Sequence, residues 1–476
     1  MKEFDLILRG GTVVTHEGVA GADVGIADGK IVAVGEKVGG SAQEEIKADD
    51  LHIFPGLIDS HVHFNDPGRT DWEGIKTGSR ALAAGGGTLF FDMPLNAHPP
   101  TCDAASFDLK LAAAENKSST DFAFWGGLVP GNLDRLEELS ERGVIGFKAF
   151  MSNSGIEDFS CVEDRTLREG MKRIAKLGQL VAVHAESEAI TRELSRQAHA
   201  HNRTGIRDYL ESRPVQAELD AIERAIEMAG ETGCALHIVH VSSAAGVALV
   251  VAARQRGVDV TCETCPHYLA LTEDDVLQLG AVAKCAPPLR PPAEQNALWE
   301  SVKAGHVTTI GSDHSPAPPE MKTDNNFFKV WGGISGLQHT LPLLLSRSRR
   351  DNEAQSRKAM AGSQSLLTSA APEIGLPLIA ALTSFNVAER FHLPPTKGRL
   401  AVGADADLAL VDLRQNFIVR AEDLLYRHKH SPYVGRALTG RVIQTILRGQ
   451  TVFQNGRSVS PPSGRLVKPQ RRPTHV

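Results

Sequence analysis

The sequence lacks the features of a secreted, membrane-spanning or nucleic-acid-binding protein. Only six of its 476 residues are cysteine, and no apolar run approaches the roughly 18 residues that cross a membrane. Residues 1–11 contain no apolar signal core, so we expect a cytoplasmic protein with reduced thiols and no membrane segment. Lys and Arg number 51 against 57 Asp and Glu. This balance disfavours a nucleic-acid partner, because such proteins usually carry a basic excess.

The remaining composition is that of a large globular protein. Hydrophobic residues make up 42% and charged residues 23%, so the chain can bury a sizeable core. Cys262 and Cys265 form a CxxC pair, but no second pair or histidine stands at a suitable spacing for a structural zinc site. We therefore expect these thiols to lie in the core.

The two ends of the chain resemble each other. Residues 7–14 read ILRGGTVV and residues 446–453 read ILRGQTVF. Hairpin-turn dipeptides stand nearby, at Asp28-Gly29 and Asn455-Gly456. We expect residues 1–51 and 386–460 to build one small β-sandwich domain around a large insert; two unrelated strand pairs are the alternative. Residues 461–476 are rich in proline and basic residues, which predicts a loose tail.

The central residues 52–385 alternate between short apolar runs and amphipathic, helix-like stretches. The apolar runs are eight, at residues 53–64, 87–95, 121–129, 144–150, 179–186, 235–243, 258–265 and 306–314. Eight strands that alternate with helices predict a parallel (β/α)₈ barrel of the α/β class. A doubly wound open sheet is the alternative.

Polar side chains follow several of these runs, where a barrel places its reactive groups. His61 and His63 are spaced i, i+2, so a strand points both to one face, as two ligands of one metal require. His237 lies three residues before His240 and should face away. The strand-end positions that we expect to form a metal site are His61, His63, Lys148, His184, His240 and Asp313.

Lys148 is the unusual member of this set. A bare ammonium beside metal cations would be strongly repelled. The lysine is either a buried salt-bridged or anion-binding residue, or a neutral amine that has condensed with CO₂. The resulting carbamate would be a two-oxygen ligand able to bridge two metals. Four histidines, this bridge and Asp313 would complete a binuclear centre, which generates a hydroxide and polarises a carbonyl.

The segments HVH, GFKAF, VAVHAE, IVHVSS and IGSDHSP, in this order, resemble those of the cyclic amidohydrolases, which include hydantoinases, dihydroorotases and allantoinases. The resemblance runs to about residue 450 and covers nearly the whole chain. It implies a distorted (β/α)₈ barrel, a flanking β-sandwich from both termini and a homotetramer. It also implies two divalent ions, most often zinc, bridged by a carboxylated Lys148, and every expected ligand position is filled.

Within this family, segments such as HVHFNDPGRTDWEG and VWGGISGLQ are similar to the allantoinase group. Asn65 stands where dihydroorotases carry an arginine that binds the substrate carboxylate, which favours a neutral ureidohydantoin. The resemblance implies opening of the allantoin ring to allantoate, with Asp313 moving the proton. Asn65 and Asn96 are the expected substrate contacts, although Asn96 could equally cap a turn. A hydantoinase or dihydropyrimidinase is the alternative; the complete ligand set argues against a metal-free scaffold.

Overall fold

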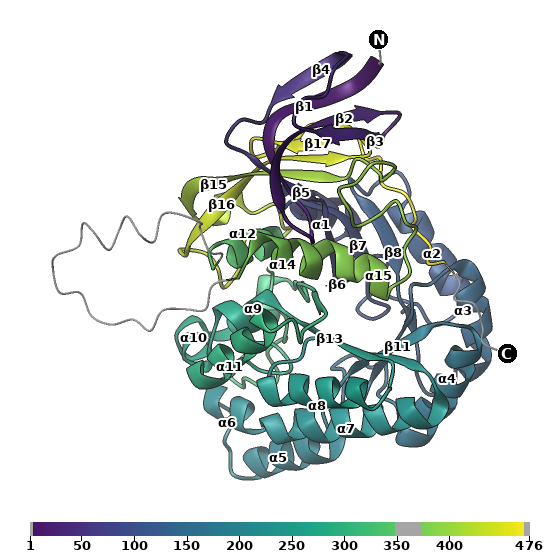
Figure 1. Cartoon of the computed structure of the whole chain (residues 1–476). Coiled ribbons are helices and arrows are strands. Elements are labelled where there is room, and N and C mark those ends of the chain that lie inside the picture. The colour runs from purple at the N-terminus through teal and green to yellow at the C-terminus, as the bar shows by residue number, and fades with distance from the viewer. Residues whose placement is uncertain (1–2, 348–373, 471–476) are drawn as a thin grey trace.

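The computed structural model describes residues 3–347 and 374–470, and its centre is a closed barrel of parallel strands (Figure 1). The strands in order are β6 (Leu57–Val62), β7 (Gly87–Asp92), β8 (Asp121–Phe124), β9 (Gly126–Gly127), β10 (Phe147–Phe150), β11 (Leu180–His184), β12 (Ala235–Ile238), β13 (Val260–Thr264) and β14 (Thr309–Ile310). β8 and β9 follow each other at one position, so every predicted run supplies one barrel strand.

Contacts at both seams close the barrel. Val62 pairs in parallel with His314, which joins β6 to the segment after β14. At the other seam, the Trp125 amide donates to Asp92 O at 3.0 Å, and the Gly126 amide donates to Gly146 O at 2.9 Å. The (β/α)₈ prediction is therefore confirmed, and the sheet is not an open one.

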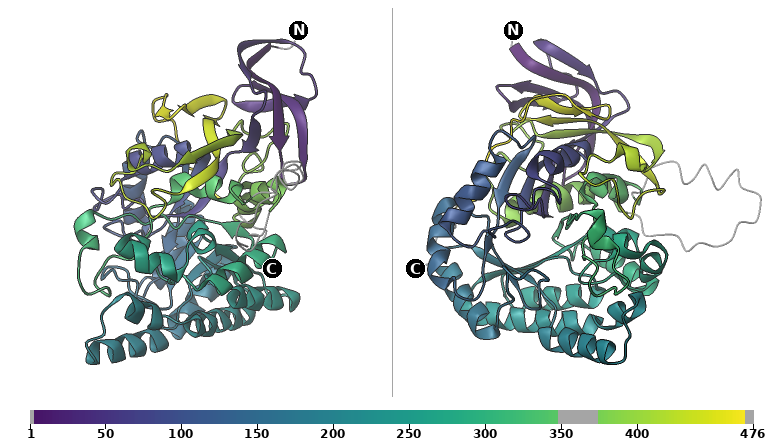
Figure 2. Two further views of the ribbon diagram at one scale, coloured as in Figure 1. Left: turned by 90° about the vertical axis from the view of Figure 1, so that its left-hand side faces the viewer. Right: turned by 180° about the vertical axis from the view of Figure 1, so that it is seen from behind.

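Helices surround the strands on the outside (Figures 1 and 2). They are α1 (Ile75–Ala84), α2 (Ala104–Ala114), α3 (Leu136–Arg142), α4 (Asp164–Lys176), α5 (Glu188–Ala200), α6 (Ile206–Glu211), α7 (Val215–Thr232), α8 (Ala244–Gln255), α9 (Pro266–Ala270), α10 (Glu273–Leu279), α11 (Pro292–Lys303), α12 (Thr340–Leu345), α14 (Leu376–Ala380) and α15 (Asn386–Arg390). Among the helices that the structure describes, none has the length and apolar character needed to cross a membrane.

Helix α7 shows how the sequence sets this packing. Ala217, Ala221, Ala225 and Ala229 recur every four residues, and all four are buried. This spacing places small side chains on one stripe of the helix, so α7 can pack closely onto the barrel. The helix ends at Gly233, whose φ of 68° lies in the left-handed region that glycine adopts without a Cβ penalty.

Both termini build one sheet above the barrel (Figure 2). Its strands are β1 (Glu3–Val14), β2 (Val19–Ala27), β3 (Lys30–Gly35), β4 (Ser41–Lys47), β5 (His52–Pro55), β15 (Leu408–Ile418), β16 (Ala437–Leu447), β17 (Gln450–Gln454) and β18 (Arg457–Ser458). The order is β18-β17-β16-β15-β5-β1-β2-β3, with β4 beside β1. The expected β unit from both termini is confirmed, and hairpin turns form at Asp28-Gly29 and Asn455-Gly456, where every φ is positive.

Two elements near the predicted domain limits belong to a different part of the fold from the one predicted. Strand β5, expected in the barrel segment 52–385, pairs with β1 and β15 of the terminal sheet. Helix α15, expected in the terminal segment, packs against β6 of the barrel. The division into two folding units stays a prediction, and the pairing shifts its limits by a few residues.

The expectation of a loose tail at 461–476 needs correction for its described part. Phe122 of β8 donates its amide to Arg465 O at 3.0 Å, and the Val467 amide donates to Phe122 O at 2.8 Å. The Val467 side chain is buried. Residues 465–467 therefore extend the edge of β8, because the pair Leu466-Val467 supplies apolar side chains within an otherwise polar segment. Residues 471–476 lie outside the described part.

A buried lysine joins the barrel to the terminal sheet. Lys397 Nζ donates to Asp121 Oδ2 of β8 at 2.7 Å and to Asp407 Oδ2, just before β15, at 2.6 Å. Burial opposes its charge, but Asp407, Asp121 and Asp405 outweigh burial and raise the pKa of Lys397 above its ordinary value. Cys262 and Cys265 form no disulfide and lie in the core as expected.

Candidate metal centre

A cavity opens where the carboxyl ends of the barrel strands meet. Its volume is about 230 Å³, which suits a small molecule rather than a macromolecule. Five predicted ligands line this cavity: His61, His63, His184, His240 and Asp313. His61 comes from β6 and His184 from β11, whereas His63, His240 and Asp313 lie in the segments after β6, β12 and β14. The structure thus brings together side chains that are up to about 250 residues apart.

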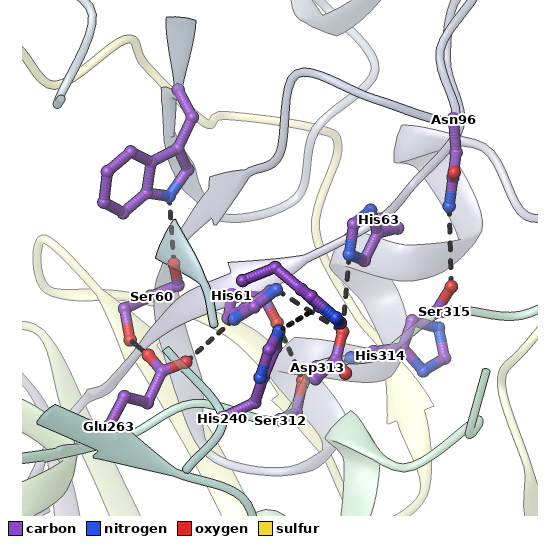
Figure 3. Close-up of polar contacts among 12 residues, drawn as sticks. Ser60, His61, His63, Asn96, His240, Glu263, Ser312, Asp313, His314 and Ser315 are labelled. Atoms are coloured by element: carbon purple, nitrogen blue, oxygen red, sulfur yellow. Dashed lines mark hydrogen bonds and ion pairs between the residues drawn. The ribbon is translucent and has the colours of Figure 1, made fainter. Parts of the chain in front are cut away.

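His61, His63 and Asp313 form the first half of the cluster (Figure 3). One ligand atom from each lies within 4.8 Å of the others. Asp313 Oδ1 is 3.4 Å from Nε2 of His61 and 3.3 Å from Nε2 of His63. The two histidines and the burial of the carboxylate act in opposite directions, and the histidines prevail, so the pKa of Asp313 falls to about 2. Asp313 is therefore an anion at neutral pH.

His184, His240 and Lys148 form the second half. His184 Nδ1 and His240 Nε2 lie 3.0 Å apart. The Lys148 side chain is completely buried, and within residues 3–347 and 374–470 its Nζ finds no hydrogen-bond partner. Burial lowers the pKa of Lys148 to about 7. The ring of His240 is centred 5.4 Å from that of His61, so the two halves form one cluster.

The cluster fits divalent metal ions. Burial lowers the pKa values of His63, His184 and His240, which keeps their rings neutral and their lone pairs free. His184 Nδ1 and His240 Nε2 lie close enough to hold one cation between them, and the nearby Lys148 Nζ has no hydrogen-bond partner among the described residues. Imidazole nitrogen and carboxylate oxygen are ligands that zinc prefers.

Glu263 orients the first half from behind. Its Oε1 lies 2.8 Å from His61 Nδ1, and its other oxygen accepts a hydrogen bond from Ser60 (Figure 3). His61 and His237 outweigh burial and lower the pKa of Glu263, so it is ionised. His237 does not line the cavity and lies behind it, with Nε2 3.9 Å from Glu263. Sequence reasoning missed Glu263, although an acidic residue inside the apolar run 258–265 was a signal.

A second carboxylate orients His184. Glu186 Oε2 lies 2.9 Å from His184 Nε2, and Arg213 forms an ion pair with the same carboxylate. Glu186 is completely buried, whereas Arg213 lines the cavity. Neither was predicted, and the only local signal was the acidic residue two positions after the histidine in VAVHAE.

The two asparagines expected to contact substrate lie in different places. Asn96 lines the cavity, and its Nδ2 is 3.5 Å from Ser315 Oγ. Asn65 is buried and donates to Pro316 O at 3.4 Å; it is not among the lining residues. Both have positive φ, 63° for Asn65 and 68° for Asn96, which asparagine tolerates in turns. Their roles towards substrate stay predictions.

Comparisons with known proteins agree with this site. The model of the family described as "Amidohydrolase family" matches residues 52–452. An allantoinase of Rubrobacter xylanophilus is 57% identical over 473 residues, with 99% of each chain covered, and one of Deinococcus radiodurans is 52% identical, with 98% of this chain and 99% of that protein covered.

Solved structures give the same fold. The L-hydantoinase (dihydropyrimidinase) from Arthrobacter aurescens superposes with a TM-score of 0.90 at 33% identity, covering 98% of this chain and all of the other. A dihydropyrimidinase from Brevibacillus agri gives 0.86 at 30%, with 98% and 99% covered. Fold, ligand geometry and full-length similarity together show that the chain belongs to the amidohydrolase family, within which it groups with the bacterial allantoinases.

Proposed function

We propose that this chain is a metal-dependent hydrolase that opens the hydantoin ring of allantoin to give allantoate. The observation that carries the proposal is the convergence of four histidines and Asp313 on one small cavity, in a chain similar over its whole length to allantoinases. Water adds to the ring carbonyl, the ring C–N bond breaks, and the nitrogen leaves with a proton. The product carries a new carboxylate.

Two divalent ions, zinc by the choice of ligands, fit this centre. His61, His63 and Asp313 would hold one, and His184 and His240 the other. When bound, such ions acidify water and polarise a carbonyl. A carboxylated Lys148 would supply a further anionic ligand to these ions, and this assignment is supported by a buried Nζ that has no hydrogen-bond partner among the described residues.

Asp313 is placed to move the proton. It is ionised at neutral pH and lines the cavity beside His61 and His63. Its carboxylate oxygen can accept a proton as water attacks and return it to the leaving nitrogen. Asn96, also on the lining, is placed to pair with a polar group of the substrate.

A substrate panel tests the proposal against its hydantoinase alternative. The four compounds are allantoin, hydantoin, dihydrouracil and dihydroorotate, compared by kcat/KM. We expect allantoin to be turned over far better than the others, because a site built around polar contacts rejects analogues that lack them. Dihydroorotate should also be turned over poorly, because it lacks the ureido group of allantoin. Equal values for allantoin and dihydrouracil would favour a broad hydantoinase.

The homotetramer and the cytoplasmic location belong to the same proposal. Light scattering on the purified protein tests the first, and cell fractionation tests the second.

A further inference from the structure

The segment from Phe327 to Gly333, here called the wall segment, is an irregular stretch of chain beside the metal centre. Its residues 328–333 all line the cavity with the ligand cluster. None of it belongs to a helix or strand. Its backbone carbonyls therefore need partners from elsewhere, because a buried peptide group without a hydrogen bond is costly.

Lys284 supplies one set of these partners. Its Nζ donates to the carbonyls of Phe327 at 2.6 Å and Val330 at 2.5 Å, and reaches that of Phe328 at 3.3 Å. The ammonium also lies 4.4 Å from the centre of the Tyr209 ring. The side chain is buried, so these contacts replace its water.

Lys322 donates hydrogen bonds to two further carbonyls of the wall segment. Its Nζ donates to Gly333 O at 2.7 Å and Trp331 O at 3.1 Å, and to Ala281 O, outside the wall segment, at 3.2 Å. Two lysines thus hold five of the seven carbonyls of the wall segment. Unlike Lys284, Lys322 does not line the cavity.

The wall segment also carries a hydrogen-bond donor without a partner. Trp331 lines the cavity, and its buried Nε1 has no acceptor in the described part of the chain. The Trp331 ring packs edge-to-face on Trp72, with centroids 4.8 Å apart. The reacting carbonyl must face the metal ligands, so the rest of a substrate meets the remaining lining, including the wall segment.

We infer that Lys284 and Lys322 are positioning residues that fix the wall segment so that it recognises the ureido arm of the substrate, with Trp331 Nε1 donating to the ureido oxygen. This inference rests on the proposed function and deepens it. The metal cluster governs the chemical step, whereas the two lysines govern how tightly and how selectively the substituted ring is held. A small displacement of a positioning group is enough to lower the fraction of productive complexes.

The test compares Lys322→Met and Trp331→Phe with wild-type holoenzyme, using allantoin and unsubstituted hydantoin. We expect each variant to raise KM for allantoin by about tenfold or more, as for the loss of one or more buried hydrogen bonds. We expect kcat to stay within about threefold, KM for hydantoin to change little, and metal content to stay at the wild-type level. Product inhibition by allantoate should weaken in parallel, since allantoate keeps the ureido group.

Matched variants separate positioning from folding. Lys397→Met removes a buried lysine that does not line the cavity, and it should lower stability without changing selectivity. Trp72→Phe alters the ring beside Trp331 but not the cavity lining, and should leave KM unchanged. The inference is overturned if Lys322→Met and Trp331→Phe leave KM for allantoin unchanged, or if they lower kcat for both substrates or lose metal. Wild-type enzyme that opens hydantoin but not allantoin would instead refute the proposed function.

Discussion

Glu263 and His61 meet 2.8 Å apart behind the metal centre, although they are 202 residues apart in the sequence. Both side chains are buried. The contact occupies Nδ1 of the histidine and leaves Nε2 turned towards Asp313, 3.4 Å away. The Glu263 carboxylate therefore sets the orientation of the His61 ring and leaves its Nε2 as the nitrogen available to a metal.

Replacing this carboxylate should weaken metal binding. We expect Glu263→Gln to lower metal affinity by about 10- to 100-fold, because the His61 ring loses its charged partner. Competition with a chromogenic chelator measures the change. His237→Asn is the matched control, since His237 also lies near Glu263 but not on the cavity, and it should keep metal content near normal.

Removing a metal ligand should lower metal binding more than removing Glu263, which only orients one. We expect His61→Asn, His63→Asn and His240→Asn each to lose metal and activity together, because an incomplete site cannot acidify water. Metal analysis by mass spectrometry, paired with allantoin turnover, provides the measurement. If His237→Asn lost metal and His240→Asn kept it, the assignment of His240 rather than His237 as the metal ligand would be wrong.

Lys148 offers a chemical rescue experiment. We expect Lys148→Ala to lose metal and activity, and short carboxylic acids to restore part of the activity by replacing the bridge. Metal-free wild-type enzyme should recover better when metal is added together with bicarbonate. A high-resolution density map with an unmodified ammonium beside two fully occupied metals would contradict the carboxylated bridge.

The Lys397 network should contribute to stability rather than to catalysis. We expect Lys397→Met to lower the free energy of unfolding by about 3–5 kcal/mol, because Asp407 remains buried without a cation and Asp121 keeps only its ion pair with Arg448. The folded-state pKa of Lys397 lies above its ordinary value, so its contribution is complete below that value and is lost only at more alkaline pH. The difference in free energy of unfolding between wild type and Lys397→Met, measured with denaturant, should therefore stay constant between about pH 6 and about pH 9. A difference that vanished at neutral pH would contradict this assignment.

The barrel could be predicted because parallel strands buried on both faces leave continuous apolar runs in the sequence. The strand-end rule then located the histidines, Lys148 and Asp313 on these runs. Glu263 was missed because its contact with His61 depends on how the strands close into a barrel, whereas Glu186 stands only two residues after His184 and was overlooked. A local pattern contains no information about a contact across 202 residues.

Similar sequences did not guarantee similar structure at the two ends. Residues 7–14 continue as one strand through a bulge near Gly10. Residues 446–453 instead turn at Arg448-Gly449, from β16 into β17. The difference follows from the neighbours: β1 pairs with β2, β4 and β5, whereas β16 folds back onto the short strand β17.

Strand β5 cannot pair with β15 during synthesis until the ribosome has translated most of the chain. Pro55 and Leu408 are register partners, yet about 350 residues separate them. At about 5–20 residues per second, the strand edge of β5 waits roughly 20 to 70 s for its partner to emerge. An unpaired edge is a template for association with other nascent chains, so early closure of the barrel and chaperone cover would both protect yield. A circular permutant that begins just before β15 would shorten this interval, because the two halves of the terminal sheet would then be translated in succession.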